Sequence, residues 1–323
     1  MSRRRLAAAA ATAAALLAAC GARDPGGAFV DSRPPPGLAE RFHPPEGWAW
    51  GLVSTGGPLH RYGVAAPAAV AGADILVLPD EGETAETWFE TIRELGGAGY
   101  TVWVLEAVGQ GGSERLKTAD RKRGDAGFAD DVAAAQAMIG QVIRPRGPLI
   151  LLGEGTGALI AARTVETGAH PAGLILSGSP CAPDVGLLRA WSAAADDAAL
   201  GRTHDAWRGA VTNAWRRANP DLRPRPPTPD WRPAREKFVA ETAAASKAIA
   251  APTLILAPEG APACLASAHA ERRVVAEAGP ALELEDDRRR EGWLAAIEVF
   301  LKQVGRRPAI PQATSLFKQG GPL

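Results

Sequence analysis

The sequence predicts an α/β fold with a mostly parallel central sheet, flanking helices and an inserted helical cap. Short apolar runs alternate with segments of helical periodicity over most of the chain, which is the pattern of a parallel sheet covered on both faces. This alternation stops over residues 187–248, where the composition shifts to Ala, Trp and Arg. The 323 residues, 46% of them hydrophobic, are enough for one large domain with a sizeable core.

The N-terminus has the pattern of an export signal. Arginines at positions 3 to 5 precede an apolar stretch that ends at Leu17 and is too short to span a bilayer. The following Ala18-Ala19-Cys20 completes a resemblance to the lipobox of bacterial lipoproteins, in which the cysteine carries the lipid. We therefore expect a signal peptide over residues 1–19 and a lipid anchor on Cys20. The alternative is an ordinary cleavage site followed by an unrelated cysteine.

A lipidated Cys20 would hold the protein on a membrane of the bacterial cell envelope, facing the periplasm. Gly21 stands where lipoproteins of the inner membrane usually have aspartate, which favours the outer membrane. Composition then divides the chain after the signal peptide into a tether, a core in two parts, an inserted cap and a disordered tail. In that order, the boundaries are 20–40 for the tether, 41–186 and 249–305 for the core, 187–248 for the cap and 306–323 for the tail.

Within the core, the apolar runs give the order of the elements. An early edge strand is expected first, and buried strands follow it. The expected strands are residues 59–65, 73–78, 101–105, 149–152, 174–176, 253–256 and 273–276. Helical periodicity and glycine stops predict the helices between them. These helices are residues 86–95, 128–142, a segment beginning at 158, and 292–304.

One glycine-rich turn carries the most specific signal. Residues 153–157 read Gly-Glu-Gly-Thr-Gly between a predicted strand and a predicted helix. In the G-x-S-x-G elbow of serine hydrolases, the serine sits on such a strand-to-helix turn and faces an oxyanion hole. Gly155 stands at the position of that serine. The alternative is a glycine-rich turn that serves another α/β fold, because short glycine motifs are common.

Six segments in the same order along the chain carry a family resemblance. They are residues 41–45, 83–90, 102–106, 109–113, the turn at 153–157 and 219–222 in the cap. Together they resemble the lysophospholipase branch of the α/β-hydrolases, which is similar to monoacylglycerol lipases. The resemblance covers residues 41–304. It implies an α/β-hydrolase fold and a catalytic triad in the chain order serine, acid, histidine.

The resemblance places the three triad positions on Gly155, Ala261 and Pro280, so no catalytic residue is expected there. Glu259 is a candidate replacement for the acid, but a carboxylate shifted along a tight turn points elsewhere. No histidine follows His269, which lies too early in the chain to be the base. Because nucleophile and base work only together, these losses close the usual route of acyl transfer.

The resemblance also indicates an altered oxyanion site. Relatives have a glycine-led loop after the first buried strand, whereas this chain has Asp80 and Glu81 there. Glu81, Glu154 and Thr156 are expected to line the site, and Thr156 supplies one N–H group. The two acidic residues of the loop either reach the site, where negative charge opposes an oxyanion, or point to solvent; both arrangements remain open.

Cys181 and Cys264 each follow a predicted strand, which places them at neighbouring ends of the sheet. An oxidising envelope compartment allows a disulfide between them. Two separate buried thiols are the interpretation that we favour, because free cysteines are often buried. Neither these residues nor the histidines have the spacing of a metal site, and no cofactor is expected.

The charge balance argues against nucleic acid as a partner, because 36 basic and 36 acidic residues give a formal net charge of +0. The leading functional hypothesis is a catalytically inactive hydrolase-fold lipoprotein that binds a lipid-like ligand or a protein partner. A second is a hydrolase of lysophospholipids or other esters that uses Asp80, Glu81 or Glu154 as acid or base. A third is an envelope interaction protein with tryptophans on its cap. These are Trp191, Trp207, Trp215 and Trp231.

Overall fold

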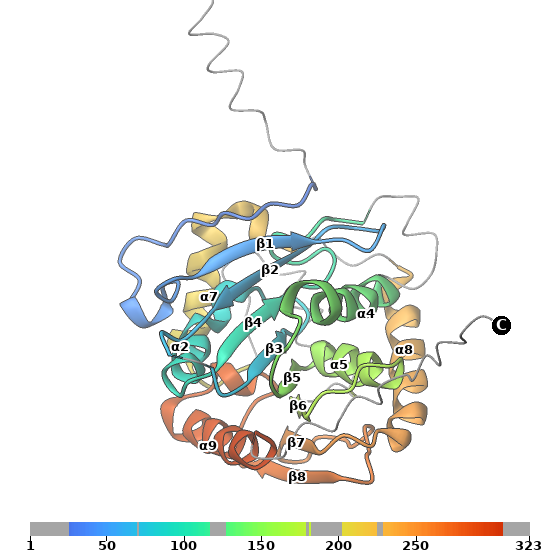
Figure 1. The fold of residues 1–323 in the computed structure, drawn as a ribbon. Helices are drawn as coiled ribbons and strands as arrows, with labels where there is room; N and C mark the ends of the chain where they lie inside the picture. The colour runs from blue at the N-terminus through green and yellow to red at the C-terminus, as the bar shows by residue number, and fades with distance from the viewer. Residues whose placement is uncertain are drawn as a thin grey trace, which may run out of the picture.

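The computed structural model describes residues 26–69, 71–116, 127–178, 181, 202–224 and 229–305. At its centre is an eight-stranded sheet with the strand order β1-β2-β4-β3-β5-β6-β7-β8 (Figure 1). The strands are β1 (Ala49–Val53), β2 (His60–Ala65), β3 (Asp74–Leu78), β4 (Thr101–Leu105), β5 (Leu149–Glu154), β6 (Gly173–Ser177), β7 (Thr253–Pro258) and β8 (Ala270–Val275). β1 and β2 pair antiparallel and all other neighbours except β2 and β4 pair parallel, so the expected mostly parallel sheet is confirmed.

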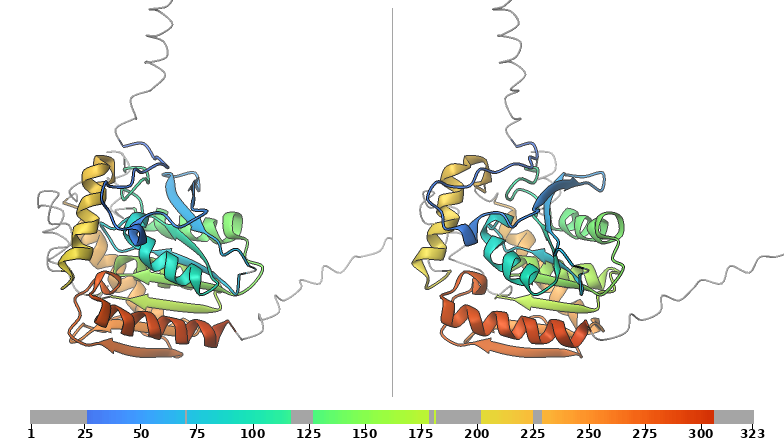
Figure 2. Two further views of the ribbon diagram at one scale, coloured as in Figure 1. Left: turned by 90° about the vertical axis from the view of Figure 1, so that its left-hand side faces the viewer. Right: turned by 60° about the vertical axis from the view of Figure 1, so that its left-hand side comes forward.

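Helices cover both faces of the sheet (Figures 1 and 2). One layer contains α2 (Phe89–Gly97) and α9 (Asp287–Val304), and the other contains α4 (Phe128–Ala137), α5 (Thr156–Glu166) and α8 (Trp231–Ala245). The packing of strand β3 explains its apolar run from Ile75 to Leu78. Ile75 and Val77 belong to the core beneath the first layer, while Leu76 and Leu78 belong to the second core. Successive side chains point to opposite faces, so a doubly covered strand needs both sets to be apolar.

Short helical turns join these elements. They are η1 (Glu40–Phe42), η2 (Ala85–Trp88), η4 (Pro220–Leu222), η5 (Ser246–Ala248) and η6 (Leu282–Leu284), with the single π-helical segment η3 (Met138–Ile143) extending α4. Two predicted boundaries shift by a few residues. β8 begins three residues before the expected strand, and α9 begins at Asp287 because Asp286 caps it by accepting a hydrogen bond from the Arg289 N–H.

The described part of the predicted cap separates into two helices with different neighbours. α7 (Ala206–Ala218) packs beside η2, near the carboxyl ends of the strands, whereas α8 packs against α5. Of the tryptophans expected on a cap surface, Trp215 is buried, Trp231 packs against the core and Trp207 is exposed. Trp191 lies outside the described residues.

The segment expected to be a flexible tether is packed where it is described. Phe29 is buried, and its N–H donates to the carbonyl of Gly112 over 2.8 Å. Arg33 and Asn219 exchange two hydrogen bonds, which connect the segment to the end of α7. The tether prediction is therefore wrong for residues 26–40. The predicted signal peptide, Cys20 and the tail at 306–323 lie outside the described residues.

Candidate functional site

The turn between β5 and α5 keeps the backbone of a nucleophile elbow. Gly155 has φ 51° and ψ −118°, a left-handed conformation that favours glycine. A Cβ on Gly153 would collide with the backbone of Gly157 and Ala158, and one on Gly157 would collide with the Leu78 carbonyl. Close packing therefore requires the outer glycines of the motif.

Asp80 occupies the space in which a nucleophile side chain would lie. A Cβ built on Gly155 falls inside the van der Waals radius of the Asp80 carboxyl group. The Thr156 N–H, which in an active enzyme would stabilise the oxyanion, donates to Asp80 Oδ1 over 2.6 Å. The carboxylate of this chain thus sits where substrate charge would develop. Of the two arrangements that the sequence left open, the structure has the one in which the acidic loop reaches the site.

Arg202 neutralises this carboxylate from the cap side. Its Nη2 donates to Asp80 Oδ2 over 2.6 Å and to Glu83 Oε1 over 3.0 Å, and the arginine side chain is 4% exposed. Its carbonyl accepts a hydrogen bond from Ala281 N–H over 3.0 Å. One residue therefore connects the loop after β3 with the loop after β8, and these are the two loops that supply the oxyanion donor and the histidine in active relatives.

Five acidic side chains are buried around this point: Asp80, Glu81, Glu83, Glu154 and Glu283. Burial raises the pKa of Asp80, and Arg202 opposes that shift. Burial also raises the pKa values of Glu81, Glu154 and Glu283 well above the usual range, with the neighbouring carboxylates adding to each shift. Glu81, Glu154 and Glu283 consequently hold their protons to higher pH than exposed carboxyl groups do, whereas Asp80 is paired with Arg202.

Arginines from the cap segments balance part of this negative charge. Arg216 donates to the carbonyl of Gly82 over 2.5 Å, and burial, with the nearby Arg202, lowers the pKa of Arg216 to about 10. Arg235 and Trp231 at the start of α8 lower the pKa of Glu81, against the larger effect of burial. The site is thus a buried network of charges and hydrogen bonds between core and cap.

The residues expected to line the oxyanion site are all close to it and all buried. Glu81 Oε2 lies 3.4 Å from Thr156 Oγ1. Glu154 is fully buried at the end of β5, where its Oε1 accepts from the Leu282 N–H over 3.4 Å. These side chains are therefore enclosed by protein atoms.

Pro280, at the position of the catalytic histidine, lies next to the elbow. Its carbonyl is 3.0 Å from the place of a Cβ on Gly178, and the Gly155 nitrogen is 3.2 Å from the same point. The adjacent Gly279 N–H donates to Glu285 Oε1 over 2.6 Å. The structure thus brings the histidine position and the nucleophile position together as the family fold requires, although neither residue can react.

The structure also shows a histidine and acid pair that the sequence prediction missed. His204 Nδ1 lies 3.0 Å from Oε1 of Glu285, whose side chain is fully buried. His204 precedes α7, in a segment without a family motif, so only the three-dimensional contact reveals the pair. Arg202 was missed for the same reason.

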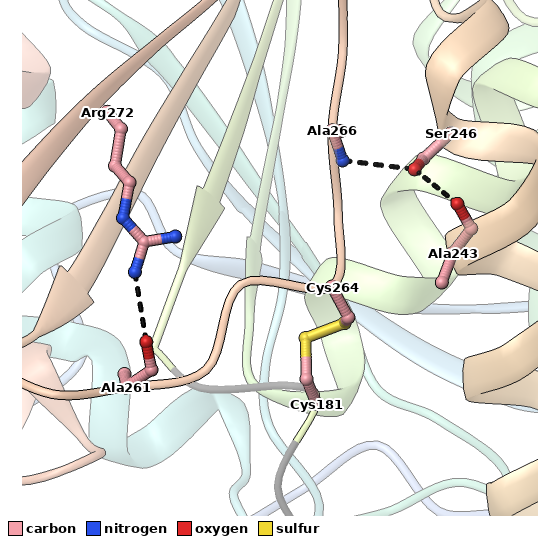
Figure 3. Close-up of a disulfide and its surroundings, with 7 residues drawn as sticks. All are labelled: Cys181, Ala243, Ser246, Ala261, Cys264, Ala266 and Arg272. Atoms are coloured by element: carbon pink, nitrogen blue, oxygen red, sulfur yellow. Dashed lines mark hydrogen bonds between the residues drawn. A yellow bond between two sulfur atoms is a disulfide. The ribbon is translucent and has the colours of Figure 1, made fainter.

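The position of the catalytic acid lies after β7. Ala261 is half-buried in a tight turn, its N–H bonded to the Pro258 carbonyl and its own carbonyl accepting from Arg272 Nη2 over 3.1 Å (Figure 3). Glu259 is exposed in this turn and His269 is exposed before β8.

Cys181 and Cys264 form a disulfide, with Cα atoms 5.7 Å apart (Figure 3). The favoured prediction of two separate thiols is therefore wrong. Parallel strands β6 and β7 are neighbours, so the segments that follow their carboxyl ends meet. The bond joins residues 83 positions apart and brackets the cap and β7. The Cα separation falls within the usual range for natural disulfides.

Within the part of the chain that the structure describes, no group of three or more His, Cys, Asp or Glu residues is arranged to hold a metal ion. Nor does this part contain a helix long and apolar enough to cross a membrane.

Comparisons with known proteins agree with the fold. The monoglyceride lipase of Saccharomyces cerevisiae, solved with a substrate analog, superposes with a TM-score of 0.58 at 16% identity, covering 80% of this chain and 96% of that one. The monoacylglycerol lipase of Paleococcus ferrophilus gives 0.55 at 17% identity, with 74% and 98% coverage. A carboxyl esterase of Bacillus coagulans superposes with a TM-score of 0.55 at 16% identity, covering 80% of this chain and 99% of that one. No curated protein matches the sequence.

A family model described as serine aminopeptidase, S33, matches residues 71–281, which include β3, the elbow, the cap helices and the loop of Pro280. The element order, the glycine-dependent elbow and this match agree with one another. The chain therefore belongs to the serine aminopeptidase S33 family and has the α/β-hydrolase fold.

Proposed function

We propose that this chain is a non-catalytic α/β-hydrolase that binds a lipid-like ligand at the bacterial cell envelope. The observation that carries the proposal is the position of Asp80. Its carboxylate fills the space beside Gly155 and accepts the Thr156 N–H that an oxyanion would need. Even a substrate that reached the elbow would meet a fixed negative charge and no nucleophile.

The lipid-like ligand is inferred from the relatives and from the surface of the chain. The relatives with the same fold include lipases of monoglycerides, and an apolar groove lies between helices of the second layer. The lipobox-like Cys20 supports an anchored, periplasm-facing protein, with the outer membrane as the preferred location. An envelope protein is the alternative partner, and nucleic acid is not proposed.

The test measures hydrolysis by the purified mature chain. Substrates are a p-nitrophenyl ester, a monoacylglycerol and a lysophospholipid, and we expect rates equal to those of buffer. A fluorophosphonate probe should leave the protein unlabelled. Turnover that disappears in Asp80→Asn or Thr156→Ala protein, while the fold is retained, would refute the proposal and identify a working catalytic centre.

A hydrolase with a non-standard centre is a second candidate, favoured by the pair of His204 and Glu285. The histidine side chain is 55% exposed and its partner is buried, an arrangement that can orient an imidazole as a general base for water. If the chain hydrolyses any ester by this route, His204→Gln should abolish turnover. The exposed His170 provides the matched control, because His170→Gln removes a histidine elsewhere on the surface.

A further inference from the structure

We infer that the groove between α4, α5 and α8 is a binding site for a long-chain fatty acid. Its volume is about 350 Å³, and its lining includes Phe128 and Val132 of α4, Arg163 of α5, and Ala234, Lys237 and Phe238 of α8. The site is separate from the former catalytic centre, since neither Asp80 nor Gly155 is part of its lining. The assignment rests on the proposed binding function and gives it a place and a ligand class.

The floor of the groove is apolar and rigid. Phe128 and Phe238 stack with ring centroids 4.7 Å apart and an interplanar angle of 2°. Both rings are buried in the core beneath the second helix layer, together with Val132 and Ala234. Because the rings are held by this core, the floor is formed before any ligand arrives, which lowers the cost of binding.

The groove has the size for one hydrocarbon chain. Small-molecule pockets usually measure about 300–1,000 Å³, so 350 Å³ is near the lower limit. Two acyl chains with a phospholipid headgroup exceed this space. A single unbranched chain follows an open groove between helices without displacing them.

Charged side chains at the rim of the groove favour a carboxylate at the end of the bound hydrocarbon. Two cations and one carboxylate, Glu241, belong to the lining. The Lys237 ammonium is 73% exposed and lies 3.7 Å from Glu241, while Arg163 is 32% exposed and lies 3.0 Å from Glu166. The exposed pair of Lys237 and Glu241 is weak, whereas the Glu166 side chain beside Arg163 is only 5% exposed. The cationic excess of the lining complements a carboxylate, and a neutral ester lacks that attraction.

The experiment measures displacement of fluorescent cis-parinaric acid from the mature chain by palmitate and by methyl palmitate. We expect palmitate to compete and to bind several-fold more tightly than its methyl ester. Ala129, which is exposed and also belongs to the lining, allows the groove to be filled without altering the core. Ala129→Trp should weaken palmitate binding about tenfold or more. The control Ala240→Trp is on the exposed side of α8 and should leave affinity unchanged.

The charge is tested by a matched pair of variants. Lys237 and Lys302 each lie four residues from a glutamate on a helix. Lys237→Glu should weaken palmitate but not methyl palmitate, and Lys302→Glu should affect neither. Unfolding midpoints equal to that of the wild type establish that the variants fold.

Three results would overturn the assignment. They are equal palmitate affinity in the wild type and Ala129→Trp, equal affinity for palmitate and methyl palmitate, and no displacement of cis-parinaric acid. If the wild type hydrolyses monoacylglycerol but Ala129→Trp still loses palmitate binding, the non-catalytic function fails and the groove stands. If hydrolysis is absent and palmitate binds equally to the wild type and to Ala129→Trp, the groove is not the binding site, while the proposed non-catalytic function is retained.

Discussion

Replacing Arg202 with methionine should destabilise the protein more than any exposed arginine substitution. The change keeps much of the apolar volume of the side chain but leaves Asp80 and Glu83 without the cation that both now contact at 2.6 and 3.0 Å. Removing one partner of a buried ion pair typically costs about 3–5 kcal/mol. In a large domain each kcal/mol lowers Tm by about 2 °C, so we expect a fall of about 6–10 °C at pH 7.5.

The assay is chemical and thermal unfolding at pH 5.5 and pH 8. Burial already raises the pKa of Asp80, and loss of the arginine raises it further. The variant can therefore take up a proton at the lower pH, and the loss of stability should be smaller there. Arg202→Met/Asp80→Asn should recover part of the loss, because no uncompensated charge remains at position 80.

Arg217→Met is the control, because Arg217 is exposed on α7; it should change stability by no more than about 0.5 kcal/mol. A loss below about 1 kcal/mol for Arg202→Met, or a loss that is equal at both pH values, would refute the view that Arg202 neutralises the buried acids.

Three further predictions concern the same region. Burial raises the pKa of Glu154 above 4.5, so the stability that its protonated form contributes is complete below that pH and is lost as pH rises through the raised pKa. Glu154→Gln should therefore flatten the decline of unfolding free energy between pH 5 and 8. An unchanged slope would contradict this. Cys181→Ala or Cys264→Ala should cost about 4–5 kcal/mol, since the bond closes a loop of 83 residues, and denaturant midpoints with and without reductant should agree for the variants but differ for the wild type. Gly155→Ser should lower Tm because its Cβ meets Asp80. Asp80→Gly alone also destabilises the protein, because it removes an ion-pair partner of Arg202. In a double-mutant cycle, Gly155→Ser should therefore cost less in the Asp80→Gly protein than in the wild type, and an equal cost would show that the carboxylate does not fill this space.

The sequence predicts the central strands well because burial on both faces leaves an unambiguous signal. β3, β4, β5, β6 and β7 lie where continuous apolar runs occur. β1 escapes prediction because it is an edge strand whose residues are mostly half-exposed, with Trp and Gly in place of a clear alternation. Residues 26–40 look like a linker by composition, although the buried ring of Phe29 and the two hydrogen bonds between Arg33 and Asn219 tie them to the folded domain.

The sequence likewise predicts some residues of the candidate site and not others. Chain order and spacing identify Gly155 and the empty histidine position, because the elbow and the strand ends are local features. The direction of the Asp80 side chain and its pairing with Arg202 depend on contacts between segments more than 120 positions apart. The disulfide likewise depends on which strands become neighbours. No local pattern contains these facts, since they follow only from the closed sheet and the packed cap.

The backbone of Gly155 opposes any side chain at this position. A residue with a side chain held at φ 51° bears strain of about 1–3 kcal/mol, and a working elbow carries this strain in exchange for activity. Glycine accepts the same conformation freely, and here the vacated space is filled by a neutralised carboxylate. A serine at position 155 would introduce both this strain and a collision with Asp80. The fold therefore favours glycine here for two independent reasons, the backbone conformation of the turn and the contact with the Asp80 carboxylate.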